Sequence, residues 1–261
     1  MSFPLSLSFP VPLTEASLAF IVAVLVFAGL VKGLIAMGMP TVGVGLLCLI
    51  MPPAQAAALI VVPAAISNVV QLATGPRLTH TVRRFWSMIV TVVAGTLVGG
   101  LVMGGLESHL APAILGLTLT VYGVMGLLNL HLRTPPALER WLSPVAGFTS
   151  GLLTGTTGVT VMPMAPYLQS LDMPKEELVQ ALGLGFAIST FALGFVLMGQ
   201  GAPFSDPTMM GASLAALVPA VAGMEIGRRL RLRVSPAAFR KCFFAGLALL
   251  GLHMLARAVL I

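Results

Sequence analysis

Apolar residues fill most of this chain in long runs, without the alternation of a half-buried strand. Six runs are about as long as the roughly 20 residues that a helix needs to cross a bilayer core. A transmembrane barrel is excluded, because barrel strands alternate apolar and polar residues, whereas these runs are apolar on every face. The runs predict six spanning helices: Ala54–Ala73, Phe85–Leu106, Leu110–Leu130, Leu178–Met198, Thr208–Ile226 and Ala237–Leu260.

Two further apolar segments, Ala16–Met51 and Trp141–Leu171, are too long for one crossing and too short for two. Both are interrupted by glycine and proline, which weaken or break a helix. Non-helical backbone is tolerated at membrane depth only where protein buries it or where it lines a water-filled cavity. Each segment is therefore predicted to be a broken, re-entrant helix hairpin.

The two halves of the chain resemble each other at matched positions. The pattern Gly29-x-x-x-Gly33 corresponds to Gly147-x-x-x-Gly151 at an offset of 118 residues. Further matches follow in the same order: Ala65–Ser67 with Ala187–Ser189 at an offset of 122, then Gly95 and Gly99 with Gly223 and Gly227 at an offset of 128. This constant order indicates an internal repeat. We interpret residues 1–131 and 132–261 as two repeats of one transmembrane domain, each a hairpin (16–51 or 141–171) followed by three helices.

Equivalent loops of the two repeats differ in positive charge. Residues 75–84 carry three arginines and the counterpart loop near residues 201–207 carries none, whereas the next pair of loops reverses this bias. If both hairpins enter and leave from one face, the loops on the cytoplasmic side hold 12 of the 14 Lys and Arg residues. The sequence therefore predicts an all-α, polytopic membrane protein with two inverted repeats and both termini outside the cytoplasm.

Composition agrees with this class and excludes others. With 57% hydrophobic and 8% charged residues, the chain cannot hide its apolar surface in a water-soluble fold, so the lipid bilayer is its main partner. Cationic cytoplasmic loops account for the net charge of +6, and no nucleic-acid partner is expected. No phosphate-binding loop, zinc motif or set of catalytic acids is present. We therefore expect no cofactor, no bound metal and no enzymatic activity.

Lys32 is the most unusual residue of the apolar segments. A lysine in a membrane helix costs about 2.5–3.5 kcal/mol on insertion scales, so an unpaired one without a purpose is improbable. Glycine and proline next to it would free backbone N–H groups and helix N-termini, which attract anions. Two alternatives stay open: the side chain reaches an interface, or it pairs with an acid such as Glu225.

The second hairpin, GFTSGLLTGTTGVTVMP, resembles the sulfite exporter TauE/SafE family. Gly147, Gly151, Gly158 and Pro163 keep the family pattern, whereas Thr156 and Thr157 stand where glycines are expected. In the first copy, Gly38 is kept and Met39 and Pro40 replace the next two glycines. The resemblance covers almost the whole chain and implies an inner (plasma) membrane protein that exports sulfite, sulfonates or related organosulfur anions. These departures leave the identity of the anion open.

Candidate substrate contacts combine the broken hairpins with polar residues of the following helices. Threonine hydroxyls are donors for an oxyanion, although threonine in a membrane helix more often bonds to its own backbone. Asn68 and Gln71 also suit hydrogen bonds between helices. A polar pair recurs at positions 67–68 and 189–190. The predicted site comprises Lys32, Gly38, Pro40, Thr41, Ser67, Asn68, Gln71, Thr156, Thr157, Gly158, Thr160, Ser189 and Thr190.

We therefore expect a secondary transporter that exports a small oxyanion by alternating access around a midplane site formed by both hairpins. The alternatives are an anion channel or uniporter of the same fold, an importer of another small anionic metabolite, and a membrane-embedded enzyme or scaffold. Oligomeric state is open, with a homodimer as one alternative.

Overall fold

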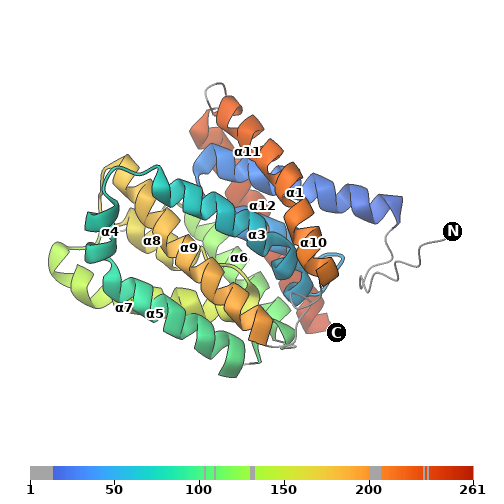
Figure 1. Cartoon of the computed structure of the whole chain (residues 1–261), viewed down its shortest axis with the longest axis horizontal. Coiled ribbons are helices and arrows are strands. Elements are labelled where there is room, and N and C mark those ends of the chain that lie inside the picture. The colour runs from blue at the N-terminus through green and yellow to red at the C-terminus, as the bar shows by residue number, and fades with distance from the viewer. Residues whose placement is uncertain are drawn as a thin grey trace.

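The computed structural model describes residues 14–102, 104–108, 110–129, 133–199, 207–231, 233 and 235–260 (Figure 1). These ranges contain helices and no strand, which confirms the all-α class. The first half contains α1 (Glu15–Ile35), α2 (Met39–Leu47), α3 (Pro53–Ala73), α4 (Leu78–Arg84), α5 (Trp86–Leu97), the π-helical η1 (Val98–Val102), the 3-10 turn η2 (Gly105–Glu107) and α6 (Ala111–Leu127). The second half contains α7 (Pro136–Thr157), α8 (Met164–Gln169), α9 (Lys175–Gly199), α10 (Pro207–Ala215), α11 (Leu217–Leu230) and α12 (Pro236–Leu260).

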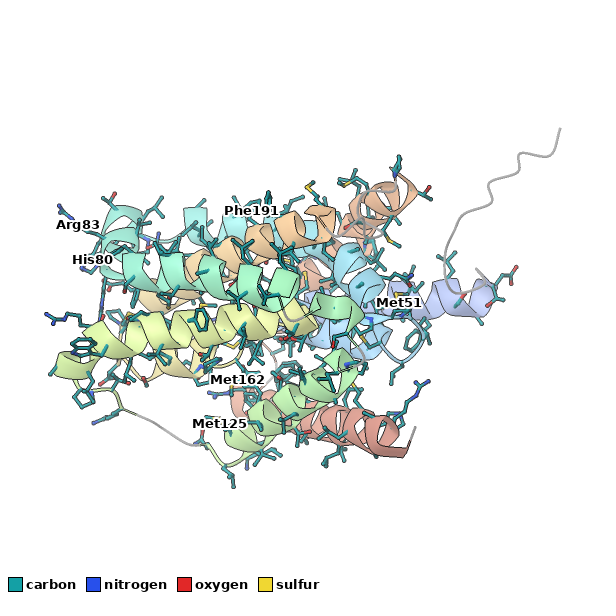
Figure 2. All side chains as sticks on the ribbon, turned by 90° about the horizontal axis from the view of Figure 1, so that it is seen from below. Met51, His80, Arg83, Met125, Met162 and Phe191 are labelled. Atoms are coloured by element: carbon teal, nitrogen blue, oxygen red, sulfur yellow. The ribbon has the colours of Figure 1, made fainter. Side chains whose placement is uncertain are left out.

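Length and composition confirm a multi-pass membrane protein. Within the described chain, five helical stretches are long and apolar enough to cross a membrane, and a sixth is added if α4 and α5–η1, bent by 66°, form one span. The six predicted helices start within three residues of the observed ones, and the predicted end at Leu130 lies outside the described residues. Large apolar side chains face outward, as Phe191 does on α9 (Figure 2), and provide a lipid-facing surface.

Each predicted hairpin segment folds as a long helix followed by a short one, whereas its entry and exit on one face of the membrane stay a prediction. Ala36 (φ 60°) ends α1 and Gly38 (φ 92°) precedes α2, so two left-handed residues reverse the chain. In the second hairpin the left-handed Gly158 ends α7. The long helices of the hairpins exceed a half-crossing: α1 has 21 residues and measures about 31 Å. The long helix of the second hairpin, α7, begins at Pro136, five residues before the predicted start, because proline suits the first turn of a helix.

Glycine allows two close helix crossings, α1 with α11 and α5 with α7. A Cβ added at Gly33 would lie 2.2 Å from the carbonyl oxygen of Met224, and one at Gly151 would lie 2.1 Å from that of Val92. Because Gly33 and Gly151 are repeat partners, Val92 and Met224 are equivalent positions. Their offset of 132 residues differs by about one helical turn from the 128 that the sequence match of α5 with α11 predicted. The periodic spacing of small residues does not by itself decide between alignments that differ by one turn.

The remaining extensive pairings, α3 with α9 and α6 with α12, join helices that are themselves repeat counterparts. At the α3–α9 crossing the Asn68 amide nitrogen donates to Thr190 Oγ1 over 3.2 Å. These residues are matched positions at the offset of 122, so the contact joins equivalent positions of the two halves. The pairing is that expected of two related repeats, whereas their inversion across the membrane stays a prediction.

Basic residues gather at one end of the helical bundle. Arg77 near α4 pairs with Glu177 at the start of α9 (2.9 Å), and Arg84 forms a two-pronged ion pair with Glu139 of α7 (2.6 and 2.8 Å). His80 and Arg83 lie at this end, and Met51 lies towards the other (Figure 2). Helix α1 begins and α12 ends on the side away from α4 (Figure 1). Which side faces the cytoplasm stays a prediction.

Candidate functional site

Lys32 lies at the centre of a polar chain that joins three helices. Its side chain is 4% exposed, and no other charged side chain within the described ranges is buried. The Lys32 ammonium of α1 donates to the side-chain oxygen Oδ1 of Asn68 on α3, and the side-chain nitrogen Nδ2 of Asn68 donates to Thr190 Oγ1 of α9. The position in the last turn of α1 also favours a cation, because the C-terminal end of a helix is partly negative.

Neither alternative interpretation of Lys32 holds. Burial excludes a side chain that reaches the interface. Glu225 is instead paired with Arg228 and Arg229, at 2.8 Å each, on the exposed end of α11. No described carboxylate forms an ion pair with Lys32. A buried cation without a counter-charge is costly, so this position is suited to an anion brought from outside the protein.

The two hairpin tips meet beside this polar chain. A small cavity of about 10 Å³ lies between them and is bounded by α3 and α9. Among the predicted site residues, four line this cavity: Pro40, Gly158, Thr160 and Thr190. Two hydroxyls adjacent in the sequence to lining residues, Thr41 Oγ1 and Ser189 Oγ, are buried without a hydrogen-bond partner among the described residues. Buried hydroxyls are normally satisfied, so these two are available to a ligand.

Other predicted residues are occupied within the protein. Thr156 and Thr157 donate to backbone carbonyls one turn earlier in α7, at 2.6–3.2 Å, and Ser67 donates to Ala64 O at 3.0 Å. Gln71 donates to Val179 O at 2.9 Å and so joins α3 to α9. Gly38 forms the first turn of α2 and packs near Phe243. For these five the structure supports a structural use.

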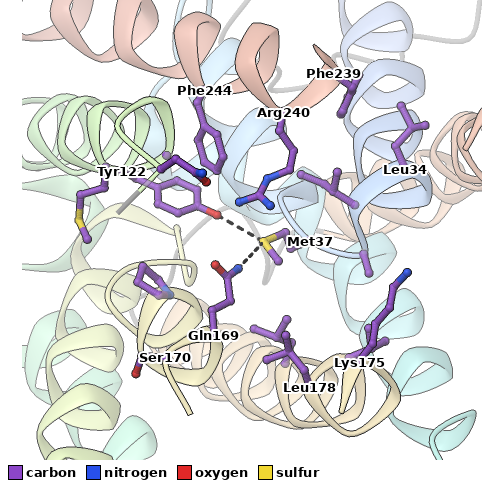
Figure 3. A pocket seen from close by; sticks show the side chains of 18 of the residues that line it. Leu34, Met37, Tyr122, Gln169, Ser170, Lys175, Leu178, Phe239, Arg240 and Phe244 are labelled. Carbon is purple, nitrogen blue, oxygen red and sulfur yellow. Dashed lines mark hydrogen bonds between the residues drawn. The ribbon is translucent and has the colours of Figure 1, made fainter. Parts of the chain in front are cut away.

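A second, larger hollow of about 430 Å³ opens at the basic end (Figure 3). We call it the vestibule. The hairpin break contributes Ala36 and Met37, and the walls include Tyr122 of α6 and Arg240 of α12. Sequence reasoning missed this hollow because its basic residues were used only as markers of loop orientation, and residues from five helices meet there only after folding.

Long apolar helices, and two broken hairpins that line one small cavity, define a multi-pass α-helical membrane protein. The chain belongs to the sulfite exporter TauE/SafE family, whose model matches residues 21–254. The match includes most of the first hairpin, the whole second hairpin and every residue of the predicted site. No curated protein and no solved structure matches the chain. Family membership makes this a membrane transporter of the class that carries sulfite-type anions.

Proposed function

We propose that this protein exports sulfite, or a closely related sulfonate or other organosulfur anion, across the inner (plasma) membrane. The observation that carries the proposal is Lys32: a buried cation without a carboxylate partner, next to the meeting point of two broken hairpins. The family supplies the chemical class of the substrate. A small oxyanion would neutralise the ammonium and accept hydrogen bonds from the hydroxyls of Thr41 and Ser189.

Alternating access is the proposed mechanism. The vestibule reaches the hairpin break from the basic end, whereas the cavity beyond it holds about 10 Å³. This combination agrees with a state that admits an anion from the basic end and is closed beyond Lys32. Movement at the α3–α9 crossing would then open the site to the opposite side. An anion leaving a negative-inside cell gains about 2.3 kcal/mol per charge per 100 mV, so export needs no co-substrate.

A channel or uniporter of the same fold is the second candidate, and an importer is the third. A cavity of about 10 Å³ has room for about one water molecule, which favours a gated carrier over a continuous pore. Single-channel currents in planar bilayers would support a channel, since a carrier that changes conformation in every cycle is far slower than an open pore. Flux that is faster into the cell than out under matched gradients would support an importer.

Efflux from proteoliposomes tests the proposal. Vesicles loaded with sulfite, sulfate, a small sulfonate or acetate would be compared at a potassium-diffusion potential that is negative inside. We expect sulfite or sulfonate efflux that increases with this potential and falls at least 100-fold in Lys32→Ala. Lys241→Ala, at an exposed lysine, is the matched control. Selective flux that persists in Lys32→Ala would remove the proposed site, and acetate carried as well as sulfite would remove the proposed selectivity.

A further inference from the structure

The vestibule combines positive charge with apolar walls. Three cations line it, Lys175 of α9, Arg231 directly after α11 and Arg240 of α12, and no aspartate or glutamate lies among its lining residues. None of the three forms an ion pair with a described residue. Its apolar lining includes Leu34, Ile35, Leu178, Phe239 and Phe244. An occupant that satisfies both surfaces has an anionic head and an apolar body.

Arg240 is the cation placed to hold such a head. Its guanidinium lies 5.9 Å from the centre of the Phe244 ring, and Phe244 meets Tyr122 edge to face with ring centres 5.2 Å apart. Figure 3 shows the Arg240 side chain pointing towards Met37 inside the vestibule. An arginine resting on an aromatic ring is oriented before a ligand arrives and keeps its five N–H donors for an anion.

Met37 is the lining residue of the vestibule that other lining residues hold in place. It lies in the break of the first hairpin, between the left-handed residues Ala36 and Gly38. The Tyr122 hydroxyl donates to its sulfur over 3.3 Å, and the Gln169 amide contacts the same sulfur over 3.8 Å (Figure 3). The first hairpin is thereby joined to α6 and to α8 of the second hairpin. After the break, Pro40 of α2 lines the small cavity between the hairpins.

We propose that the vestibule is a second anion site, distinct from the Lys32 site, which binds an organic sulfonate with an aromatic body and thereby inhibits transport. At about 430 Å³ against about 10 Å³, the vestibule accommodates a ligand that is too large for the small cavity between the hairpins. Such a ligand lies against Arg240 and Phe244 and covers the Met37 contact. Only the inhibition rests on the proposed function, because binding to the vestibule is independent of transport.

Calorimetric titration of the purified full chain in detergent with 1-naphthalenesulfonate tests the binding site. We expect one molecule bound per chain, with affinity reduced at least tenfold in Arg240→Gln and largely kept in Arg240→Lys. Arg257→Gln, near the end of α12 and outside the vestibule, is expected to bind like the wild type. The neutral analogue 1-naphthol is expected to bind at least tenfold more weakly than the sulfonate.

Two outcomes would overturn the assignment. Equal affinity in Arg240→Gln and the wild type would show that the probe binds elsewhere, and a loss in Lys32→Ala as large as that in Arg240→Gln would place it at the midplane. In proteoliposomes, the probe is expected to inhibit sulfite efflux when added to the vestibule side only, and equal inhibition from both sides would contradict the proposal. If no anion is carried at all, the proposed function fails, whereas the titration still decides whether the site exists.

Discussion

The two hairpins share one backbone plan but differ at one equivalent position. Lys32 of α1 corresponds to Ser150 of α7 at the offset of 118 residues. Lys32 reaches across to Asn68 on another helix. The Ser150 hydroxyl instead accepts a hydrogen bond from the Met164 backbone N–H at the start of α8, over 2.8 Å, and so ties the second hairpin to itself. One hairpin supplies a charge and the other supplies a rigid support.

This difference separates the demands of scaffold and site. Close backbone approach is needed in both repeats, so the glycines of both crossings are kept. A site between the repeats serves both halves at once, and one ammonium is enough for it. A second lysine at position 150 would place a like charge in the same buried region, where repulsion and desolvation add. The chemistry can therefore be asymmetric on a symmetric scaffold.

The comparison is tested most severely by removing the charge. Lys32→Met keeps the volume and length of the side chain and removes the ammonium. We expect at least a 100-fold loss of sulfite efflux together with a higher melting temperature in detergent, because an unpaired buried cation destabilises the fold while it serves a ligand. Efflux and thermal unfolding would be measured on the same preparation.

Lys241→Met, on the exposed face of α12, is the control for the effect of methionine itself. A Lys32→Met protein that is less stable than the wild type would show that Lys32 is structural. In that case the contacts of Lys32 within the protein would stabilise the fold by more than the burial of its charge destabilises it.

More of the fold than of the site could be predicted from the sequence. The lengths of the apolar runs locate the helices, and Gly38 and Gly158 mark breaks that the structure contains, because these signals are local. The repeat alignment of α5 with α11 was wrong by one turn, since one stripe of small residues matches another equally well when shifted by four positions. The sequence also could not show which hydroxyls lack a hydrogen-bond partner. Thr157 and Ser189 are both hydroxyl residues within apolar helices, yet only Ser189 lacks a partner in the fold.

The glycine crossings should be the most sensitive part of the scaffold in both repeats. A Cβ at Gly29 would lie 2.0 Å from the Ala220 carbonyl oxygen, and one at Gly151 would meet Val92 in the same way. Backbone cannot move as a side chain does, so each alanine substitution should cost about 1–3 kcal/mol or more. Expression level and melting temperature would report the loss.

Gly246→Ala is the matched control, because nothing lies within 4 Å of a Cβ at that position. If Gly29→Ala is tolerated as well as Gly246→Ala while Gly151→Ala is not, the two crossings are not equivalent and the repeat has diverged in its packing as well as its chemistry.

Ser150→Ala tests the support assigned to the second hairpin. The change leaves the Met164 N–H buried without its acceptor, which should cost about 1–3 kcal/mol. Ser150 contacts no residue of the proposed substrate site, so efflux per folded molecule should stay within about twofold of the wild type. A twofold change is small, because even a tenfold change in rate corresponds to only about 1.4 kcal/mol. Melting temperature and efflux, normalised to folded protein, separate the two effects. A large loss of efflux at unchanged stability would assign the second hairpin a direct part in transport.

The smallest effect is expected at Thr156, where the sequence suggested a ligand. Its hydroxyl donates only to the carbonyls of Leu152 and Leu153 in its own helix, and such bonds add little because those carbonyls can keep their helical partners. Thr156→Val should change stability by about 0.5 kcal/mol and leave efflux nearly unchanged.

Ser189→Ala removes a buried hydroxyl that has no partner in the protein, so efflux should fall about tenfold, the effect of losing one hydrogen bond worth about 1.4 kcal/mol. The reverse result, with efflux lost in Thr156→Val and kept in Ser189→Ala, would move the substrate contacts into the second hairpin and leave Lys32 without its proposed ligand.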